Sequence, residues 1–389
     1  MNFELSDEQQ LTKDSVERLM ADEYGFESRR NYQKEKRGYS EAMWSRYAEM
    51  GLLALPFAEE HGGVGGGAVE MMVVMEAFGK GLILEPYFAT VVLAGSVLRH
   101  AANEAQKAEL ISAIAEGRQT WAFAYAEPQS RYDLFDVETT AKKEGGGWIL
   151  NGTKSLVLHG DTVDRVIVSA RTSGHRREKD GIGLFVVDAS ARGVSRRGYP
   201  TQDGSRAAEV TLDNVRATDV IGDPTGAYEI ISRVADEAIA ALCAEAVGCF
   251  DQMQSITLDY LKTREQFGKK IGTFQALQHR AADVFVELEQ SRSMAMYAAI
   301  MTGESDPEQR ERAMSAAKVQ IGRSARLIGQ ESVQFHGGIG MTMEYSIGHY
   351  FKRVTMIDRM LGDAAHHLKR LAALEGTDSE QQTWGLIDA

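Results

Sequence analysis

The hydrophobic pattern of this chain changes its period twice, near residue 120 and again near residue 226. Before the first change and after the second, apolar residues recur at spacings of three and four, which is typical of amphipathic helices. Between the changes, short runs rich in β-branched and aromatic residues alternate with turn sequences such as EGGGW, which indicates strands. This order argues against the alternating βαβ pattern of a doubly wound sheet. We therefore predict a multidomain α+β protein, with a helical domain over 1–120, a β domain over 121–225 and a helical domain over 226–389.

The helical domain after residue 226 is expected to be a bundle. Four long helices are predicted, over 226–262, 274–302, 307–336 and a last segment ending near 374. Breaks at REQFGKKIG, TGESDPE and HGGIG separate them. The chain has only 6 prolines in 389 residues, which favours helices of this length. Four long helices joined by short breaks are typical of a helix bundle.

Charge and composition narrow the classes of partner. The net charge of −13 argues against nucleic acid, whose phosphates require a basic surface. The N-terminal sequence MNFELSDEQQ is charged and lacks the apolar core of a signal peptide, and no apolar run reaches the length of a membrane-spanning helix. We therefore expect a cytoplasmic protein with no membrane partner. Cys243 and Cys249 are too few for a disulfide framework and are expected to be structural filler.

Two motifs contain the residue types of a phosphate site or a metal site, but their surroundings in the sequence argue against both kinds of site. The glycines from Gly62 to Gly67 lack the preceding strand and the βαβ unit of a dinucleotide-binding fold, so they are expected to form a loop between helices. Any bound dinucleotide would need another architecture. His366 and His367 are neighbours on a predicted helix and point in different directions, which makes them a poor pair of ligands. No metal site is expected.

Five segments of the chain, taken in order, resemble motifs of the acyl-CoA dehydrogenase family. They are EEHGGVGGG with the helix after it, AYAEP, WILNGTKSLVLHGDTVDRVIVSART, REQFGKKIGTFQALQHRAAD and QFHGGIGMTMEY. The resemblance covers nearly the whole chain. It implies an N-terminal helical domain, a middle β-barrel-like domain and a C-terminal four-helix bundle. It also implies FAD as cofactor, an acyl-CoA thioester as substrate, electron-transfer flavoprotein as electron acceptor, and a homotetramer or heterotetramer.

The resemblance also implies which residues contact FAD. Arg264 suits the pyrophosphate because a guanidinium makes two charge-assisted hydrogen bonds to phosphate oxygens, and in the family the equivalent arginine reaches the FAD of a neighbouring subunit. The glycines of QFHGG allow a ligand to approach closely, but their pattern also fits a helix C-cap. The implied cofactor contacts are Tyr125, Ala126, Leu158, Arg264, Phe267, Gln275, Gln334, Gly337, Gly338, Ala365 and His367.

Three positions depart from the family pattern near the flavin ring. Ala126 stands where a threonine hydroxyl is usual, and Tyr132 takes the place of a serine. Leu158 has no side-chain donor to offer near flavin N5. The resemblance then implies a ring held by backbone amides or arranged differently.

The catalytic base is a further departure. The family reaction needs a carboxylate with a raised pKa to remove the α-proton while a hydride leaves the β-carbon. Aligned from the last arginine of GDAAHHLKR, Asp363 takes the position of the family glutamate, which requires a two-residue insertion within FKRVTMIDRM. Aligned without a gap from Gln334, Leu361 falls there and the chain has no base. A different interpretation of Asp363 is the N-cap of the last helix.

An earlier helix offers another location for the base. Some relatives carry it within the segment that aligns with ADEAIAALCAEAVG, where this chain has Ala238. Asp236 and Glu237 lie beside this position but out of register. Asp363 is therefore the preferred candidate.

We predict from the resemblance an FAD-dependent α,β-dehydrogenation of an acyl-CoA, with Asp363 as the base. The altered motifs and the GDAAHHLKR sequence are similar to small subunits of bacterial dehydrogenases that act on dicarboxylic, pimeloyl-type, cyclic or steroid-derived acyl-CoAs. Some of these work as heteromers. One alternative is therefore a non-catalytic or half-site partner subunit of a heteromeric dehydrogenase. Another alternative is an acyl-CoA oxidase.

Overall fold

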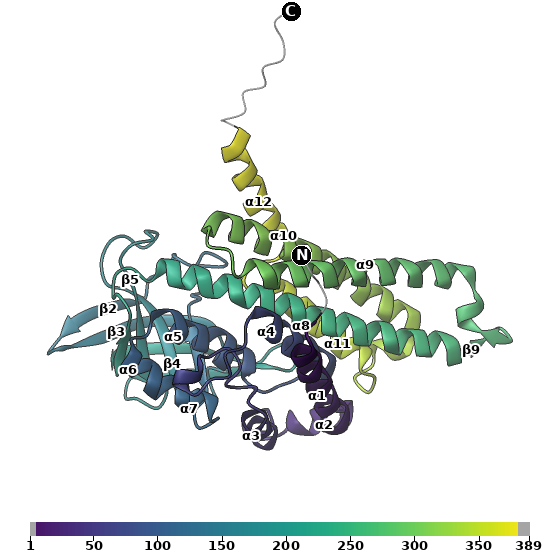
Figure 1. Cartoon of the computed structure of the whole chain (residues 1–389), viewed down its shortest axis with the longest axis horizontal. Helices are drawn as coiled ribbons and strands as arrows, with labels where there is room; N and C mark the ends of the chain where they lie inside the picture. The colour runs from purple at the N-terminus through teal and green to yellow at the C-terminus, as the bar shows by residue number, and fades with distance from the viewer. Residues whose placement is uncertain (1–4, 380–389) are drawn as a thin grey trace, which may run out of the picture. The chain divides into compact units, whose positions relative to one another are not determined.

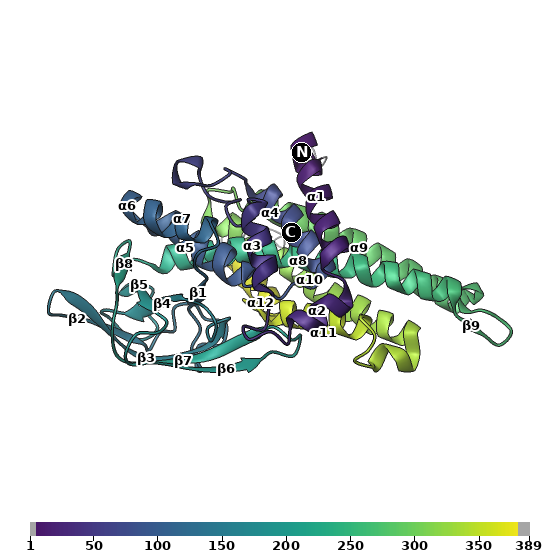
Figure 2. The same ribbon diagram turned by 90° about the horizontal axis from the view of Figure 1, so that it is seen from below.

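The computed structural model describes residues 5–379 (Figures 1 and 2), so both ends of the chain lie outside the description. Within this range the chain forms two compact units. The mixed unit comprises residues 5–74 and 81–238, and the helical unit comprises residues 75–80 and 239–379. Helices α4 and α8 pass from one unit to the other. The three predicted domain ranges remain predictions.

The first part of the mixed unit is helical, as predicted. Ser6 caps the first helix, and Gln9 completes a capping box with it, because the sequence places Ser and Gln three residues apart before an apolar stripe. The helical elements are α1 (Asp7–Glu23), α2 (Phe26–Tyr32), α3 (Glu41–Glu49), the 3₁₀ turn η1 (Glu59–His61), α4 (Ala68–Gly81), the π-helix η2 (Phe88–Ala94), α5 (Gly95–Ala101), α6 (Glu104–Gln106), the π-helix η3 (Lys107–Ile111) and α7 (Ser112–Ala115).

The rest of the mixed unit contains one eight-stranded sheet (Figure 2). Seven strands follow the order β6-β7-β3-β2-β4-β5-β8, and β1 pairs in parallel with β4. Most other pairs are antiparallel, and apolar side chains such as Val166, Phe185 and Val210 fill the core of the sheet. The strands are β1 (Trp121–Ala124), β2 (Thr140–Glu144), β3 (Gly147–Leu158), β4 (Arg165–Arg171), β5 (Ile182–Asp188), β6 (Val194–Pro200), β7 (Arg206–Arg216) and β8 (Asp219–Ile221).

The helical unit contains the long helices that the sequence predicts after residue 226 (Figure 1). The predicted last helix is wrong in one respect, because it is two helices separated by Leu361 and Gly362, whose φ angles are +56° and +109°. The elements are α8 (Tyr228–Thr263), β9 (Glu265–Gln266), β10 (Lys269–Lys270), η4 (Ile271–Thr273), α9 (Gln275–Met301), α10 (Pro307–His336), η5 (Gly337–Met341), α11 (Ile347–Arg359) and α12 (Ala364–Ser379).

Residues 75–80 of α4 belong to the helical unit because two glycines let helices cross closely. A Cβ atom on Gly248 of α8 would lie 1.9 Å from the carbonyl oxygen of Glu76. A Cβ on Gly79 would lie 2.0 Å from the carbonyl oxygen of Glu245. Neither position can carry a side chain without separating α4 from α8. No helix among the described residues is long and apolar enough to cross a membrane.

Candidate cofactor and substrate site

Arg264 and Phe267 lie on an exposed β-hairpin that follows α8. The backbone N–H of Arg264 donates to the carbonyl of Tyr260 at 2.8 Å, which continues the helix into the hairpin. Phe267 and Gly268 form its two-residue tip with φ angles of +55° and +77°, as a type I′ turn requires. The side chain of Arg264 is exposed, and Phe267 is 92% exposed. The hairpin thus presents a cation and an aromatic ring to the surroundings of the helical unit.

The glycines of QFHGG form the turn at the C-terminus of α10. Gly337 has φ +60° and ψ −137°, a conformation that favours glycine, so the predicted helix C-cap is confirmed. Gln334, Gly337 and Gly338 are exposed. A Cβ on either glycine would meet no atom within 4 Å. This backbone is therefore accessible to a ligand, although the FAD contact itself remains a prediction.

Tyr260 connects the hairpin to this glycine turn. Its ring lies 4.5 Å from the ring of His336, and its hydroxyl donates to the carbonyl of His336 at 3.5 Å. His336 also contacts the ring of Tyr345 at 5.0 Å, and its Nδ1 lies 2.8 Å from the carbonyl oxygen of Ser332. Burial lowers the pKa of His336, and its Nε2 is buried without a hydrogen-bond partner in the described chain. The aromatic stack brings the motifs of Arg264 and Gly337 together.

Gln275 begins α9 close to the same end of the helical unit, and its side chain is exposed. One and a half turns later, the guanidinium of Arg280 lies 5.4 Å from the ring centre of Phe335 and pairs with Glu331 at 2.6 Å. The start of α9 therefore packs along the last turns of α10. All six implied cofactor residues at this end, Phe267 among them, are exposed to solvent.

The implied flavin-ring residues of the mixed unit lie where β1 leads into the sheet. The N–H of Ser155 in β3 donates to the carbonyl of Ala126 at 2.9 Å. Beside it, the buried Lys154 donates to Glu127 at 2.7 Å. Burial opposes the charged carboxylate, but Lys154 prevails and lowers the pKa of Glu127 to about 2. This ion pair fixes Ala126 against β3, and sequence reasoning missed it although both residues lie in quoted motifs.

Tyr125 and Leu158 are half-buried neighbours of this region. The ring of Tyr125 packs against Phe123 at 5.4 Å, and burial raises the pKa of its hydroxyl. Leu158 ends β3 opposite Ala207, just after an irregular register between Lys154 and Val157. A bulge of this kind redirects a strand end and its backbone groups. The mixed unit thus holds Tyr125, Ala126 and Leu158 on adjoining segments, and their contact with flavin remains a prediction.

Asp363 is the N-cap of α12, as its second interpretation predicted. Its Oδ1 accepts the N–H of His366 at 2.9 Å, and its Oδ2 accepts from the guanidinium of Arg359 at 2.8 Å. The side chain is 20% exposed. The segment FKRVTMIDRM, within which the two-residue insertion would lie, is helical through Arg359, and the break in the helix follows at 360–363. Its role as a base remains a prediction.

His367 is fully buried and holds the α11–α12 junction together. Its Nε2 lies 3.0 Å from the carbonyl oxygen of Leu361, so this nitrogen carries the proton, and Nδ1 accepts from the hydroxyl of Ser315 at 3.1 Å. Burial, followed by the charge of Lys318, lowers the pKa of His367 to about 3. Ala365, the other implied contact on this helix, is exposed. His367 therefore has a structural role whether or not it also contacts FAD.

Lys318 supports the same junction from α10. Its Nζ donates to the carbonyls of Ile357 at 2.6 Å and Asp358 at 3.2 Å, and the side chain is fully buried. Burial lowers the pKa of this lysine to about 8. A buried ammonium needs such acceptors, because an unpaired charge is costly to bury.

Glu237 is a poor alternative base. It pairs with Arg99, and its Oε1 lies 2.8 Å from Nε2 of His100. Burial opposes ionisation, but the hydrogen bond to His100 and the charge of Arg99 lower the pKa of Glu237 to about 2. A carboxylate with this pKa has little tendency to take a proton near neutral pH. Asp236 and Ala238 are both buried.

The helical unit separates its implied cofactor residues into two groups. Gln334 and the glycine turn lie at the C-terminus of α10, whereas His367 contacts Ser315 near its N-terminus. Residues 315 and 334 are about 28 Å apart along the helix, at roughly 1.5 Å per residue. The two ends of α10 therefore cannot contact the same small part of one bound cofactor.

Comparisons with known proteins identify the family of this chain. Three family models match in order: "Acyl-CoA dehydrogenase, N-terminal domain" over residues 6–118, the "middle domain" over 122–215 and the "C-terminal domain" over 225–374. The probable acyl-CoA dehydrogenase YngJ of Bacillus subtilis (strain 168) is 29% identical over 378 residues, which cover 95% of this chain and 98% of YngJ.

Two further relatives extend the comparison. The mitochondrial long-chain specific acyl-CoA dehydrogenase of Sus scrofa is 30% identical, over 86% of this chain and 79% of that protein. A solved structure described as the Tcur3481-Tcur3483 steroid ACAD has a TM-score of 0.86 and 28% identity, over 96% of this chain and 99% of that one. It shares the fold of this chain, whose N- and C-terminal parts are helical and whose middle part is a β domain, as predicted. This chain belongs to the acyl-CoA dehydrogenase family.

Proposed function

We propose that this chain catalyses the α,β-dehydrogenation of an acyl-CoA thioester with FAD, uses Asp363 as the base and passes electrons to an electron-transfer flavoprotein. One observation carries the proposal beyond the family assignment. The helical unit keeps Arg264 and the Gly337–Gly338 turn exposed, and it fixes them together through Tyr260 and His336. An exposed arginine beside an exposed glycine turn suits the binding of a phosphate-containing ligand.

The residues at this end fit the adenosine diphosphate part of FAD. Arg264 offers paired donors for a phosphate, and the exposed glycines let backbone N–H groups approach it. The buried Nε2 of His336 is a polar atom that still lacks a partner among the described residues. Because the other implied contacts of the helical unit lie about 28 Å away along α10, we propose that this end serves the FAD of a neighbouring chain in a homotetramer or heterotetramer.

Bound FAD would supply the acceptor for the hydride that leaves the β-carbon of the substrate. Asp363 would take the α-proton, and for this its Oδ2 must leave the guanidinium of Arg359. Its Oδ1 can stay on the N–H of His366 and keep the carboxylate oriented. Backbone amides near Ala126 and Leu158 would hold the ring in place of the missing side-chain donors.

The test is the visible spectrum of the protein purified alone, followed by anaerobic addition of a panel of acyl-CoAs. A flavin spectrum that one substrate bleaches supports a self-sufficient dehydrogenase and names its substrate class. A flavin spectrum that the whole panel leaves unchanged contradicts the catalytic assignment of Asp363. Peroxide formed in air with the same substrate would indicate an oxidase instead.

A half-site subunit of a heteromeric dehydrogenase is the second candidate function. Two observations favour it: both carboxylate oxygens of Asp363 already have partners, and Leu361 and Ala238 occupy the other positions for a base. The structure of Tcur3481-Tcur3483, whose description names two proteins, has the same fold. A colourless protein that becomes yellow only when a related chain is co-expressed would support this candidate over the first.

A further inference from the structure

A glycine-containing turn positions His61, a buried residue of the mixed unit. The N–H of His61 donates to the carbonyl of Ala58 at 3.0 Å, and Gly62 continues the turn with φ +80°. A Cβ on Gly63 would lie 1.9 Å from the carbonyl oxygen of Phe57, so only glycine permits this path. The side chain of His61 is 9% exposed. The turn therefore fixes the backbone of His61, and burial restricts the movement of its imidazole.

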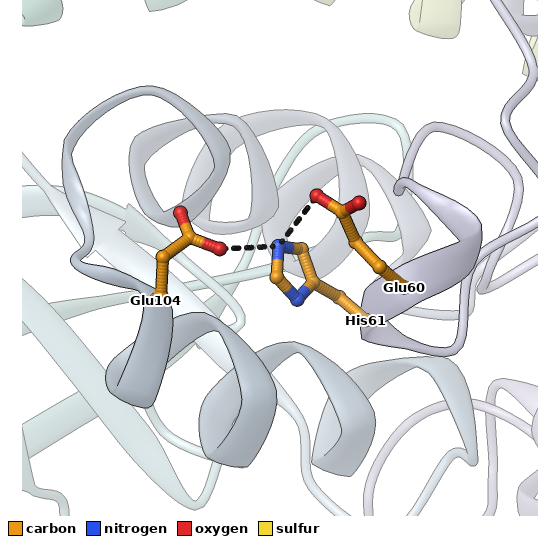
Figure 3. Close-up of side chains that lie close together, drawn as sticks. All are labelled: Glu60, His61 and Glu104. Atoms are coloured by element: carbon orange, nitrogen blue, oxygen red, sulfur yellow. Dashed lines mark ion pairs between the residues drawn. The ribbon is translucent and has the colours of Figure 1, made fainter.

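Two carboxylates face the same nitrogen of this histidine (Figure 3). Oε1 of Glu60 lies 3.5 Å from Nε2 of His61, and Oε2 of Glu104 lies 3.3 Å from it. The second oxygen of Glu104 accepts from Lys107 at 3.0 Å. Lys107 thus orients the carboxylate, with its other oxygen toward His61.

The distances match the edges of a metal coordination shell better than strong hydrogen bonds. Charge-assisted hydrogen bonds between nitrogen and a carboxylate are about 2.7–2.9 Å long. Nitrogen and oxygen ligands of a tetrahedral zinc ion are about 3.4 Å apart, given bonds of roughly 2.0–2.2 Å to the metal. The three ligand atoms all lie within 4.8 Å of one another. Among the residues that the structure describes, this is the one group of three such side chains.

We propose that Glu60, His61 and Glu104 bind a divalent transition-metal ion, with Zn²⁺ as the best fit. Imidazole nitrogen with carboxylate oxygen is a ligand set that suits zinc, whereas Ca²⁺ and Mg²⁺ prefer oxygen ligands alone. The two carboxylates balance the charge of the ion. Water completes the shell, because both glutamates are 73% exposed on their side chains. The ion would tie the turn η1 to helix α6.

The test is calorimetric titration of the full-length protein with ZnCl₂ after chelator treatment, together with the melting temperature. We expect one Zn²⁺ per chain at this group and a melting temperature that rises with Zn²⁺, because an ion that binds only the folded state stabilises it. Glu104→Gln and Glu60→Gln should each weaken Zn²⁺ binding by about tenfold or more, because each removes an ionised ligand. Glu59→Gln in η1 and Glu109→Gln in η3, the element that directly follows α6, are matched controls, and they should bind Zn²⁺ as the parent does.

Other results would overturn the proposal. Unchanged Zn²⁺ affinity in both variants, CaCl₂ binding as tight as that of ZnCl₂, or no Zn²⁺ binding at millimolar concentration would each do so. Because His61 is buried, a substitution there endangers the fold, and the exposed glutamates carry the test instead. The readout is independent of flavin and turnover, so its failure leaves the proposed dehydrogenase function untouched.

Discussion

At its N-terminal half, helix α10 carries Ser315 and Lys318, whose polar atoms are bound to the α11–α12 junction. At its C-terminus the same helix carries Gln334 and a glycine turn, which are exposed. The first end is closed, because the chain supplies its own partners for each buried polar group named there. The second end is open, because an exposed arginine and two exposed glycines lie beside a buried histidine nitrogen without a partner.

This difference separates two kinds of family position. At the closed end, His367 is explained by folding alone, since it orients the junction from inside a fully buried site. At the open end, packing among the described residues does not explain Arg264 and Gly338. Contact with a ligand or a neighbouring chain would explain both. Substitutions at the closed end should therefore act on stability, unless Asp363 also performs chemistry.

The largest expected effect tests that exception. Asp363→Asn should lower turnover by roughly 10²- to 10⁴-fold, the usual contribution of a general base. Asparagine caps a helix about as well as aspartate, so the melting temperature should change little. Steady-state kinetics with an acyl-CoA that bleaches the flavin measures the effect.

Two further variants separate a loss of catalysis from a loss of the helix cap or of the ion pair. Asp363→Ala removes the cap as well and should cost about 1 kcal/mol of stability. Arg359→Gln removes only the ion pair and frees Oδ2 of Asp363. Turnover retained in full by Asp363→Asn would eliminate Asp363 as the base and would favour the half-site subunit.

At the open end, Arg264→Ala should weaken FAD binding by roughly ten- to a hundredfold, because a hydrogen bond to a charged group contributes about 1.5–3 kcal/mol. Arg264→Lys keeps the charge but not the paired donors, so its FAD affinity should lie between those of the parent and of Arg264→Ala. The ratio of flavin to protein after gel filtration measures the effect, with Lys262→Ala as the exposed control on the same helix end. Equal flavin content in all variants would remove Arg264 from the site.

Sequence patterns gave the elements of this fold more reliably than its contacts. The periodicity predicted the long helices, because each buries one continuous stripe, and the helix C-cap at Gly337 was identified from local chemistry. The split of the last helix was missed, because its pattern stays apolar through Leu361, whose positive φ depends on its surroundings. Local signals do not record such tertiary constraints.

The site was harder to predict where residues distant in sequence meet. The motif around Arg264 was recognised, yet its connection to His336 through Tyr260 spans 76 positions. The bond between Ser315 and His367 spans 52 positions. No metal site was expected, because no local pattern indicates that Glu104 faces His61. Each of these contacts depends on how helices pack, which a single sequence does not specify.

The closed end should make stability depend on pH. Burial lowers the pKa of His367 to about 3, so as the pH falls below about 6.5 the unfolded chain binds a proton here that the folded chain refuses. Between pH 6.5 and 5, this one group should raise the unfolding constant roughly tenfold. Urea denaturation at both pH values measures it, with exposed His279→Gln as the control. His367→Gln should lose this part of the dependence, and an unchanged dependence would contradict the inference.

The smallest effect on stability belongs to the tip of the open hairpin. Phe267 is 92% exposed, so Phe267→Ser should change the unfolding free energy of the chain by no more than about 0.5 kcal/mol. If the hairpin serves a neighbouring chain, the same substitution should lower flavin content or the size of the assembly, measured by light scattering. If Phe267→Ser changes neither stability, flavin content nor assembly size, the ring of Phe267 has no partner in the assembly. A loss of assembly at unchanged stability would instead show that the open end of α10 is completed by another chain.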